Sequence, residues 1–256
     1  MPLLNTADTL YVGADPVDAV YLGSDLVWSS VPPFAPTDIA NLDLWLDAST
    51  ITGSDGASVS AWTDLSPAAH TISTTNPLGA GTLAAPTLQV AELNGLNVLE
   101  FDTTSGMRGH TSTSNQYSAF IVARMLPGTH GRIFTAIYPE GSNHLVGWWQ
   151  AQEEVFYSGN FLQSTARAAT TNWRLLGLTH DAVSSATSYR EGVAIETRSD
   201  ANAAWASTVS LNGYAAAAVD EMSNCQIAEV VIYNRQLDTA ELAALNGYLM
   251  TKWGLA

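Results

Sequence analysis

The sequence predicts an all-β fold, an antiparallel sandwich of the jelly-roll type, with a small N-terminal β-module and one C-terminal α-helix. From residue 39 onward, short runs of β-branched and aromatic residues alternate with clusters of Gly, Asn, Ser and Pro. This pattern is typical of strands separated by turns. Helical periodicity is clear only near the C-terminus, and many strands with few helices favour a sandwich or jelly roll.

Residues 1–30 contain a short repeat, in which Tyr11–Val17 and Tyr21–Val27 share the pattern Tyr-x-Gly-(Ala/Ser)-Asp-x-Val. Each copy predicts strand, turn and strand. About 30 residues bury little core alone, so we expect this module to anchor the chain on a neighbouring chain or domain. An N-terminal hairpin of the main domain is the alternative. The anchoring residues would be Tyr11, Val17, Tyr21, Val27 and Trp28.

Residues 31–37 contain Pro32, Pro33 and Pro36, which stiffen the backbone and remove amide donors. We interpret this segment as a semi-rigid linker. The main domain then covers residues 38–256.

Strands are expected where apolar and polar residues alternate or β-branched residues cluster. The expected strands are Leu42–Asp47, Ser60–Leu65, Val98–Asp102, Ser118–Met125, Arg132–Tyr138, His144–Gln150, Glu154–Tyr157, Trp173–Asp181, Thr187–Arg190, Val193–Thr197 and Gln226–Tyr233. The final helix begins at Asp238, which forms a capping box with Glu241, and ends at Gly254. Its apolar face consists of Leu242, Leu245, Leu249 and Trp253.

Composition excludes several classes of function. The chain has 24 acidic and 9 basic residues, a net charge of −15, which disfavours nucleic acid and anionic lipid as partners. The single cysteine, Cys225, excludes an internal disulfide and multi-cysteine metal sites. We expect no signal peptide and no transmembrane helix.

The segment His144–Gln150 suggests a binding surface. Alternation places His144, Trp148 and Gln150 on one face of a strand and Trp149 on the other. We predict that Trp148 is exposed and stacks on a sugar ring, with Tyr157 and Asn160 on the next strand, and that Trp149 is buried. The alternative is that both tryptophans belong to the core or to an interface.

Metal binding is an open question in the sequence. Asp47, Asp64 and Asp102 lie at predicted strand ends, where carboxylates from distant loops can assemble a calcium site. Solvated turn aspartates are the alternative. The histidines lack ligand spacing, so no other cofactor is expected; they are His70, His110, His130, His144 and His180.

Four segments occur in an order that resembles the concanavalin A-like, laminin-G-like jelly-roll domains of bacterial and phage surface proteins. They are Leu44–Ser49, Val59–Ser66, Leu93–Asp102, and Ile227–Leu237 with the helix that follows. The resemblance spans about residues 38–256. The chain departs from the family after the second segment, where Pro67-Ala-Ala-His70 replaces a Gly/Asn-rich turn.

The same resemblance bears on catalysis. Glycosidases on this fold usually carry a Glu-x-Asp-x-(x)-Glu strand, which is missing here. Glu153 and Glu154 are adjacent and would point to opposite faces of an extended strand. No serine-hydrolase, zinc-protease or nucleotide-binding motif occurs. We therefore expect a protein that is not an enzyme.

Asp8–Trp28 resembles the short modules that open minor tail proteins of actinobacterial phages. Together, the two resemblances imply a structural protein on the tail or capsid surface of a virion. It would contact other virion proteins through the N-terminal module and adhere to a host-surface glycan, as a trimer by analogy. The alternatives are a capsid decoration protein that makes only protein contacts and, third, a glycan-cleaving enzyme.

Overall fold

The computed structural model describes residues 10–12, 14–17, 19–22, 25–29, 34–77, 82–112, 114–137, 143–162, 167–181, 183–199, 208–214 and 221–255. The chain divides into two compact units, Met1–Ala35 and Pro36–Ala256. Each unit is described by itself below.

The N-terminal unit consists of two hairpins, and each copy of the repeat forms one of them. β1 (Leu10–Val12) pairs with β2 (Asp15–Val17), and β3 (Ala19–Leu22) pairs with β4 (Asp25–Ser29). The predicted strand–turn–strand units are thus confirmed.

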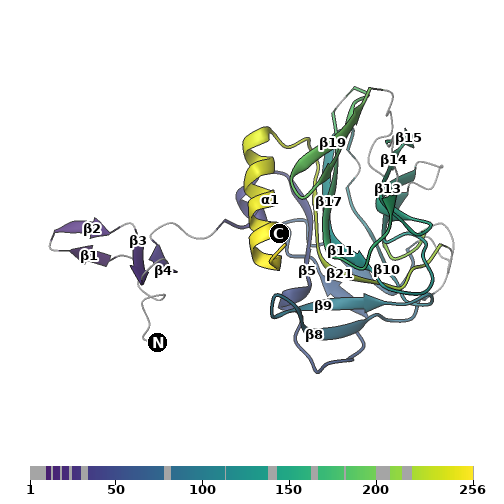
Figure 1. Cartoon of the computed structure of the whole chain (residues 1–256), viewed down its shortest axis with the longest axis horizontal. Coiled ribbons are helices and arrows are strands. Elements are labelled where there is room, and N and C mark those ends of the chain that lie inside the picture. Colours follow the sequence, from purple (N-terminus) through teal and green to yellow (C-terminus); the bar gives the residue numbers. More distant parts are fainter. Residues whose placement is uncertain are drawn as a thin grey trace. The chain divides into compact units, whose positions relative to one another are not determined.

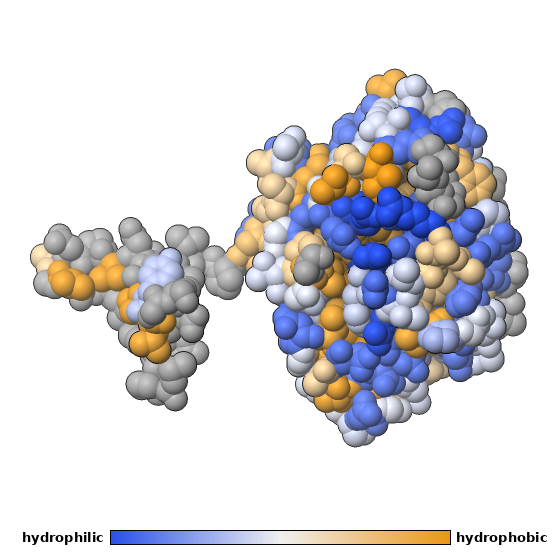
Figure 2. Space-filling view, viewed as in Figure 1, coloured by the Kyte–Doolittle hydropathy of each residue, from blue (hydrophilic) through white to orange (hydrophobic). Residues whose placement is uncertain are grey.

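Apolar side chains lie at the surface of this unit, as Figure 2 shows. Val12 is 73% exposed, Tyr21 62% and Leu22 65%, whereas Val17 is half-buried. The side chains of three residues predicted to anchor the module lie outside the described part of the chain; they are Tyr11, Val27 and Trp28.

The second unit is a sandwich of two antiparallel sheets, as predicted (Figure 1). The helix-covered sheet has the order β19 (Val193–Arg198), β18 (Ala186–Arg190), β17 (Arg174–His180), β11 (Tyr117–Met125), β21 (Cys225–Tyr233), β9 (Leu96–Phe101) and β8 (Thr87–Leu93), with β5 (Leu42–Asp47) also on β21. The second sheet has the order β15 (Asn160–Phe161), β14 (Gln152–Ser158), β13 (Asn143–Trp149), β12 (Phe134–Ile137), β20 (Thr208–Leu211), β10 (Met107–His110), β7 (Thr71–Ser73) and β6 (Ala61–Thr63), with β16 (Arg167–Ala168) on β14. Short 3₁₀ turns at Pro36–Asp38 and Ala48–Thr50 flank β5.

The core lies between the two sheets and follows the alternation of the sequence. Leu44 and Leu46 are fully buried in it, and Trp62 fills the gap from β6. Trp45 and Asp47 lie on the opposite face of β5, where polar groups meet them. Burial of these apolar side chains is the main force that holds the sheets together.

A bulge in β21 determines the direction of the Glu229 side chain. The register pairs Val122 with Glu229 and Ala123 with Ile227, so Ala228 is the extra residue. A bulge reverses which side chains face the core in the rest of a strand. Glu229 therefore leaves the core face and points toward α1 (Thr239–Trp253).

Glu229 is fully buried, and its carboxylate joins β5 and β21 to α1. It accepts hydrogen bonds from Trp45 Nε1 (2.7 Å), Trp253 Nε1 (2.6 Å), Lys252 Nζ (2.7 Å) and Tyr248 OH (3.0 Å). We call this set of contacts the Glu229 clasp. Lys252 Nζ also lies 2.6 Å from a carboxylate oxygen of Asp47. Burial raises the pKa of Glu229, and the Lys252 charge opposes that rise.

Helix α1 has the ends that the sequence predicts. The Asp238 side chain accepts from Glu241 N in a capping box, and Gly254 ends the helix in the left-handed region at φ 62°. Leu245, Leu249 and Trp253 are buried. In the described residues, no helix combines the length and the hydropathy that crossing a bilayer requires.

The clasp predicts a pH-dependent effect of Lys252→Met. Because burial raises the folded-state pKa of Glu229, stability falls as the pH rises from the unfolded-state pKa of 4.5 to the folded-state pKa, and this contribution is constant at higher pH. Removing the Lys252 charge should cost about 3–5 kcal/mol at pH 7, and the cost should shrink toward pH 4–5 as Glu229 becomes protonated. Urea unfolding at several pH values measures this, with Lys252→Arg as the charge-conserving control. An equal loss at every pH would contradict the role assigned to Lys252.

Candidate binding site

The predicted exposure of the two tryptophans on β13 is wrong. Trp148 is 0% exposed and belongs to the core, whereas Trp149 is half-buried at the surface. Alternation does place His144 and Trp148 on one face, but that face is the inner one. The buried His144 Nδ1 lies 3.3 Å from the hydroxyl of Tyr117, which belongs to β11 of the opposite sheet. A polar partner inside the core thus accommodates a residue that looked solvent-facing.

Three aromatic side chains gather on the outer face of β13, β14 and β15, and we call them the aromatic patch. The rings of Trp149 and Phe161 stack with centroids 5.4 Å apart. Tyr157 meets Phe161 edge-on, with centroids 5.0 Å apart. The hairpin register pairs Tyr157 with Phe161, which explains their contact, and Phe161 stays 41% exposed. The patch therefore offers an apolar ring surface to a ligand.

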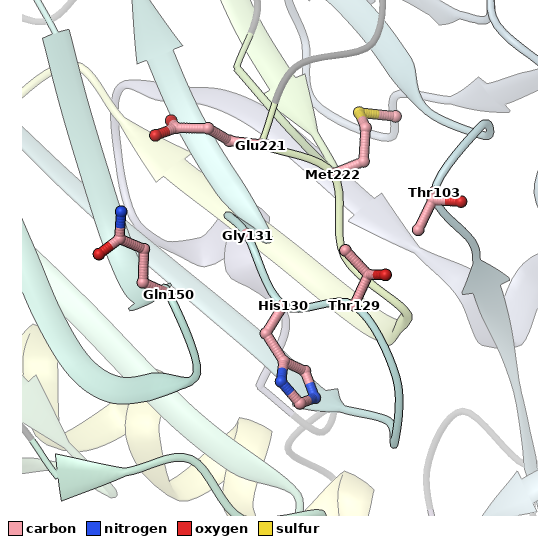
Figure 3. Close-up of a pocket in the computed structure, with 7 residues that line it drawn as sticks. All are labelled: Thr103, Thr129, His130, Gly131, Gln150, Glu221 and Met222. Atoms are coloured by element: carbon pink, nitrogen blue, oxygen red, sulfur yellow. The ribbon is translucent and has the colours of Figure 1, made fainter.

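A polar pocket of about 380 Å³ adjoins the patch (Figure 3). Its lining consists of Thr103, Thr129, His130, Gly131, Gln150, Glu221 and Met222. Trp149 Nε1 donates a hydrogen bond to Glu221 Oε1 at 3.1 Å, which joins the patch to the pocket. Figure 3 shows Gln150, Glu221 and His130 on different sides of the hollow.

Glu221 and His130 are held in place by further contacts. Glu221 forms an ion pair with Arg132, whose guanidinium carbon lies 4.7 Å from the centroid of the Tyr214 ring. His130 Nε2 lies 3.0 Å from the carbonyl oxygen of Leu126. These contacts orient the polar groups of the pocket before a ligand arrives, which lowers the entropic cost of binding.

The structure brings together only part of the predicted sugar site. Gln150 is exposed and lines the polar pocket, Tyr157 belongs to the aromatic patch, and Asn160 is exposed in the adjoining hairpin. His144 and Trp148 lie in the core instead. The sequence analysis missed the functional candidates Trp149, Phe161, Glu221, His130, Thr103 and Thr129.

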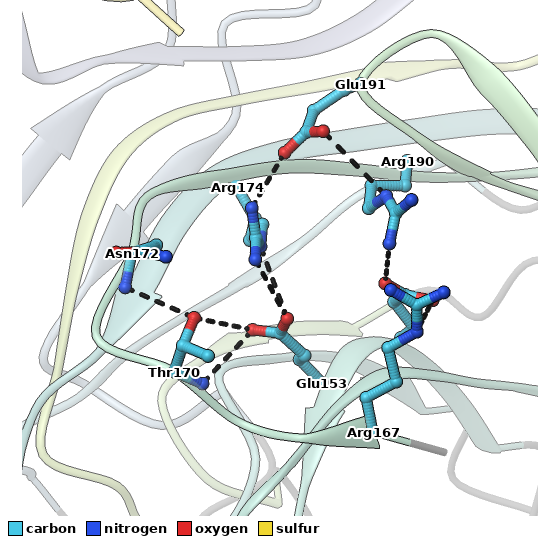
Figure 4. Close-up of polar contacts among 8 residues, drawn as sticks. Glu153, Arg167, Thr170, Asn172, Arg174, Arg190 and Glu191 are labelled. Carbon is cyan, nitrogen blue, oxygen red and sulfur yellow. Dashed lines mark hydrogen bonds and ion pairs between the residues drawn. The ribbon is translucent and has the colours of Figure 1, made fainter. Parts of the chain in front are cut away.

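Glu153 and Glu154 are both buried, and arginines bind both carboxylates. Figure 4 shows Glu153 facing Arg174, which belongs to the helix-covered sheet. A bulge in β14 makes Glu154 the extra residue, with φ 64°. Glu153 lies 3.2 Å from Arg174 Nη2, and Glu154 forms ion pairs with Arg190 and Arg167. Because arginine binds each carboxylate, the two do not form an acid and nucleophile pair of the glycosidase kind.

The aspartates expected to bind calcium do not come together in one site. Asp64 accepts from the amides of Trp45 (2.9 Å), Ser66 (2.9 Å) and His70 (2.8 Å). Asp102 accepts from Thr104 and Ser105 in its own turn, and Asp47 accepts from Ser49. Within the described segments, no group of three or more acidic, histidine or cysteine side chains is placed to hold a metal ion. These aspartates thus stabilise the conformation of their loops by accepting hydrogen bonds from backbone amides.

No family model and no curated protein matches this sequence. Solved structures do match. The botulinum neurotoxin serotype D binding domain has a TM-score of 0.58 at 11% identity, covering 85% of this chain and 56% of its own. The serotype G binding domain has a TM-score of 0.57 at 13% identity, covering 82% and 53%.

Domain 4 of AbnA, an extracellular arabinanase of Geobacillus stearothermophilus solved with arabinotriose, has a TM-score of 0.52 at 16% identity. The match covers 75% of this chain and 100% of that domain. This chain therefore corresponds to the whole arabinanase domain but spans only about half the length of the toxin domains. At such identities the similarity shows only the fold, a β-sandwich.

The corrected positions on β13 and β15 predict opposite effects of two substitutions. Trp148→Ala should lower the free energy of unfolding by about 3–5 kcal/mol, because it empties a core site. Phe161→Ala should cost about 0.5–1.5 kcal/mol, because a partly exposed ring loses its aromatic neighbours. Chemical denaturation compares the two variants, and a larger loss for Phe161→Ala would overturn the placement.

Proposed function

We propose that this chain is a non-catalytic, glycan-binding structural protein of a phage virion. The sandwich would bind a host-surface glycan, and the N-terminal unit would attach the chain to other virion proteins. The observation that carries the glycan assignment is the aromatic patch beside a polar pocket, joined by the hydrogen bond from Trp149 to Glu221.

The arrangement suits the chemistry of a sugar. A pyranose or furanose ring has an apolar C–H face that packs on an aromatic ring, and the exposed part of Phe161 provides such a surface. The hydroxyl groups at the sugar's edge need hydrogen-bonding partners nearby. Gln150 provides an amide and Glu221 a carboxylate, and Thr103 adds a hydroxyl.

Two further findings support binding without catalysis. Two of the matched structures were solved with sugars: the arabinanase domain with arabinotriose, and a serotype D toxin domain with N-acetylneuraminic acid. In addition, the adjacent carboxylates Glu153 and Glu154 are bound by arginines. A general acid or nucleophile would need to reach the substrate.

The virion assignment rests on the N-terminal unit. Its two hairpins match the tandem repeat that resembles phage tail modules. Each hairpin is too small to bury a core, and exposed Val12, Tyr21 and Leu22 offer apolar surface to a partner. We propose assembly with other virion proteins through this unit, and a trimer as the oligomeric state.

The glycan proposal predicts which side chains binding requires. Phe161→Ala and Trp149→Ala should each weaken adsorption to host cell-wall polysaccharide by about tenfold or more, because stacking area is lost. Val193→Ala, at a position 69% exposed on β19 of the other sheet, is the matched control and should bind normally. A glycan array and a cell-adsorption assay measure this. If the unmodified chain binds no glycan, the architectural role in the capsid or tail becomes the better explanation.

The virion proposal predicts that the two units separate in function. Removing residues 1–35 should leave the melting temperature of the sandwich within about 2 °C of the full chain, because its core and clasp are intact. The truncated chain should fail to enter virions, as electrophoresis of purified particles would show. A truncated chain that unfolds would mean that residues 1–35 complete the sandwich core.

A further inference from the structure

Arg108 on β10 is a buried cation, and no carboxylate among the described residues forms an ion pair with it. The residue is 0% exposed, and its Nη1 donates to the carbonyl oxygens of Met107 (3.0 Å) and Leu211 (3.1 Å). Its Nε and Nη2 have no hydrogen-bonding partner in the part of the chain that the structure describes. Burial lowers the pKa of Arg108 to about 10, so the guanidinium stays charged at neutral pH.

The unpaired edge of this guanidinium has a particular shape. Nε and Nη2 lie on the same side of the planar group, and their N–H bonds run parallel. This is an edge with which arginine holds a carboxylate through two hydrogen bonds. Leaving a buried charged donor without a partner is costly, so this edge of Arg108 is a candidate donor for a bound ligand.

Arg108 lines a second pocket, of about 500 Å³, which we call the arginine pocket. The lining also contributes imidazoles and hydroxyls, from His70, Thr71, Ser73, Thr75 and His110. Two carboxylates contact the lining residue His70. Asp43 Oδ1 lies 3.1 Å from His70 Nε2 and also accepts from Ser112 Oγ at 2.6 Å, and Asp64 Oδ2 accepts from the His70 backbone N at 2.8 Å. Both carboxylates are thus engaged by other groups, and the pocket has the Arg108 guanidinium in its wall with hydroxyl groups around it.

We propose that the arginine pocket binds the carboxylate of an acidic sugar, with Nε and Nη2 of Arg108 as the donors. The hydroxyls of Thr71 and Ser73 would hydrogen-bond the sugar ring around that carboxylate. The identification of the ligand as a sugar rests on the proposed function; the anion site itself rests on Arg108.

The strand register places the arginine pocket and the aromatic patch on one face of the second sheet. Arg108 pairs with Ser210, Ser210 with Thr135, Thr135 with Leu145, and Leu145 with Tyr157. Four strand spacings separate Arg108 from Tyr157, about 19 Å. The two sites therefore lie on the same side of the sandwich, and the outer-face residues Ser210, Thr135 and Leu145 between them are buried.

The net charge of the chain further restricts the class of ligand that the arginine pocket can bind. A net charge of −15 repels a polyanion such as nucleic acid at long range. A single carboxylate within an otherwise neutral glycan avoids most of this repulsion, which salt screens beyond about 10 Å. The pocket is therefore suited to isolated uronic or similar acidic units.

Titration calorimetry of the full chain with sodium D-glucuronate, D-glucose and inorganic phosphate tests the proposal. We expect glucuronate to bind at least about tenfold more tightly than glucose, because glucose lacks the group that Arg108 would hold. Arg108→Gln should remove this preference. Thr75→Glu, an exposed position on the rim, should weaken glucuronate binding by repulsion, whereas its neutral match Thr75→Gln should bind as the unmodified chain does.

Each outcome of these binding measurements either supports or overturns the proposed carboxylate site. If Arg108→Gln fails to fold, the Thr75→Glu and Thr75→Gln pair still shows whether the ligand's charge is recognised here. Equal binding of glucuronate and glucose, or equal binding by the two Thr75 variants, overturns the inference. Tighter binding of phosphate would overturn the sugar carboxylate in favour of a phosphate group. If the preference for a carboxylate is absent but neutral glycans still bind through Phe161, the proposed function stands and only this inference fails. If neutral glycans do not bind either, the proposed function and this inference both fail.

Discussion

The buried carboxylate of Glu229 is the constraint on which much of the sandwich depends. A carboxylate inside a long apolar strand is costly unless it is paired and hydrogen-bonded. The bulge at Ala228 turns it out of the core, and α1 supplies Tyr248, Lys252 and Trp253 as donors. These contacts therefore fix the position of α1 against β5 and β21. They also hold β21, the central strand of that sheet, from the face opposite the core.

This arrangement makes the two sheets unequal. Helix α1 covers the sheet that contains β21, as Figure 1 shows, so that sheet serves mainly as the structural layer. The second sheet carries the aromatic patch and both pockets on its strands and adjoining loops. Arginines that bind Glu153 and Glu154 tie the layers together near β14. A rigid support below and an accessible face above is the usual arrangement for a binding site.

Local rules explain what could be predicted. The capping box at Asp238, the glycine end at Gly254 and the alternation around Leu44 depend on neighbours in sequence, so they were predicted correctly. The strands Thr71–Ser73, Thr87–Leu93, Met107–His110 and Thr208–Leu211, together with the short Asn160–Phe161 and Arg167–Ala168, escaped detection. Met107–His110 contains Arg and Gly, and its strand conformation depends on its neighbours β7 and β20 rather than on propensity.

The error on β13 has a different cause. Period-two alternation groups His144 with Trp148 correctly, but it does not say which group faces the core. The polarity of His144 favoured the incorrect prediction that this face is exposed. Its buried partner Tyr117 is distant in sequence and lies on the other sheet, so no local pattern indicates it. For the same reason, no local pattern could show that Phe161 meets Trp149 or that Glu221 joins them.

The buried charges separate structural groups from functional candidates. Glu229, Glu153, Glu154 and Asp47 are buried, and each has a lysine or arginine partner, so these groups stabilise the fold. Arg108 is buried to the same degree, yet its Nε and Nη2 have no partner among the described residues. The buried carboxylates among the described residues all have hydrogen-bonding or ion-pair partners, so the unpaired edge of Arg108 marks a place where stability has been given up. Proteins tend to tolerate such violations at functional sites, where a ligand supplies the missing partner.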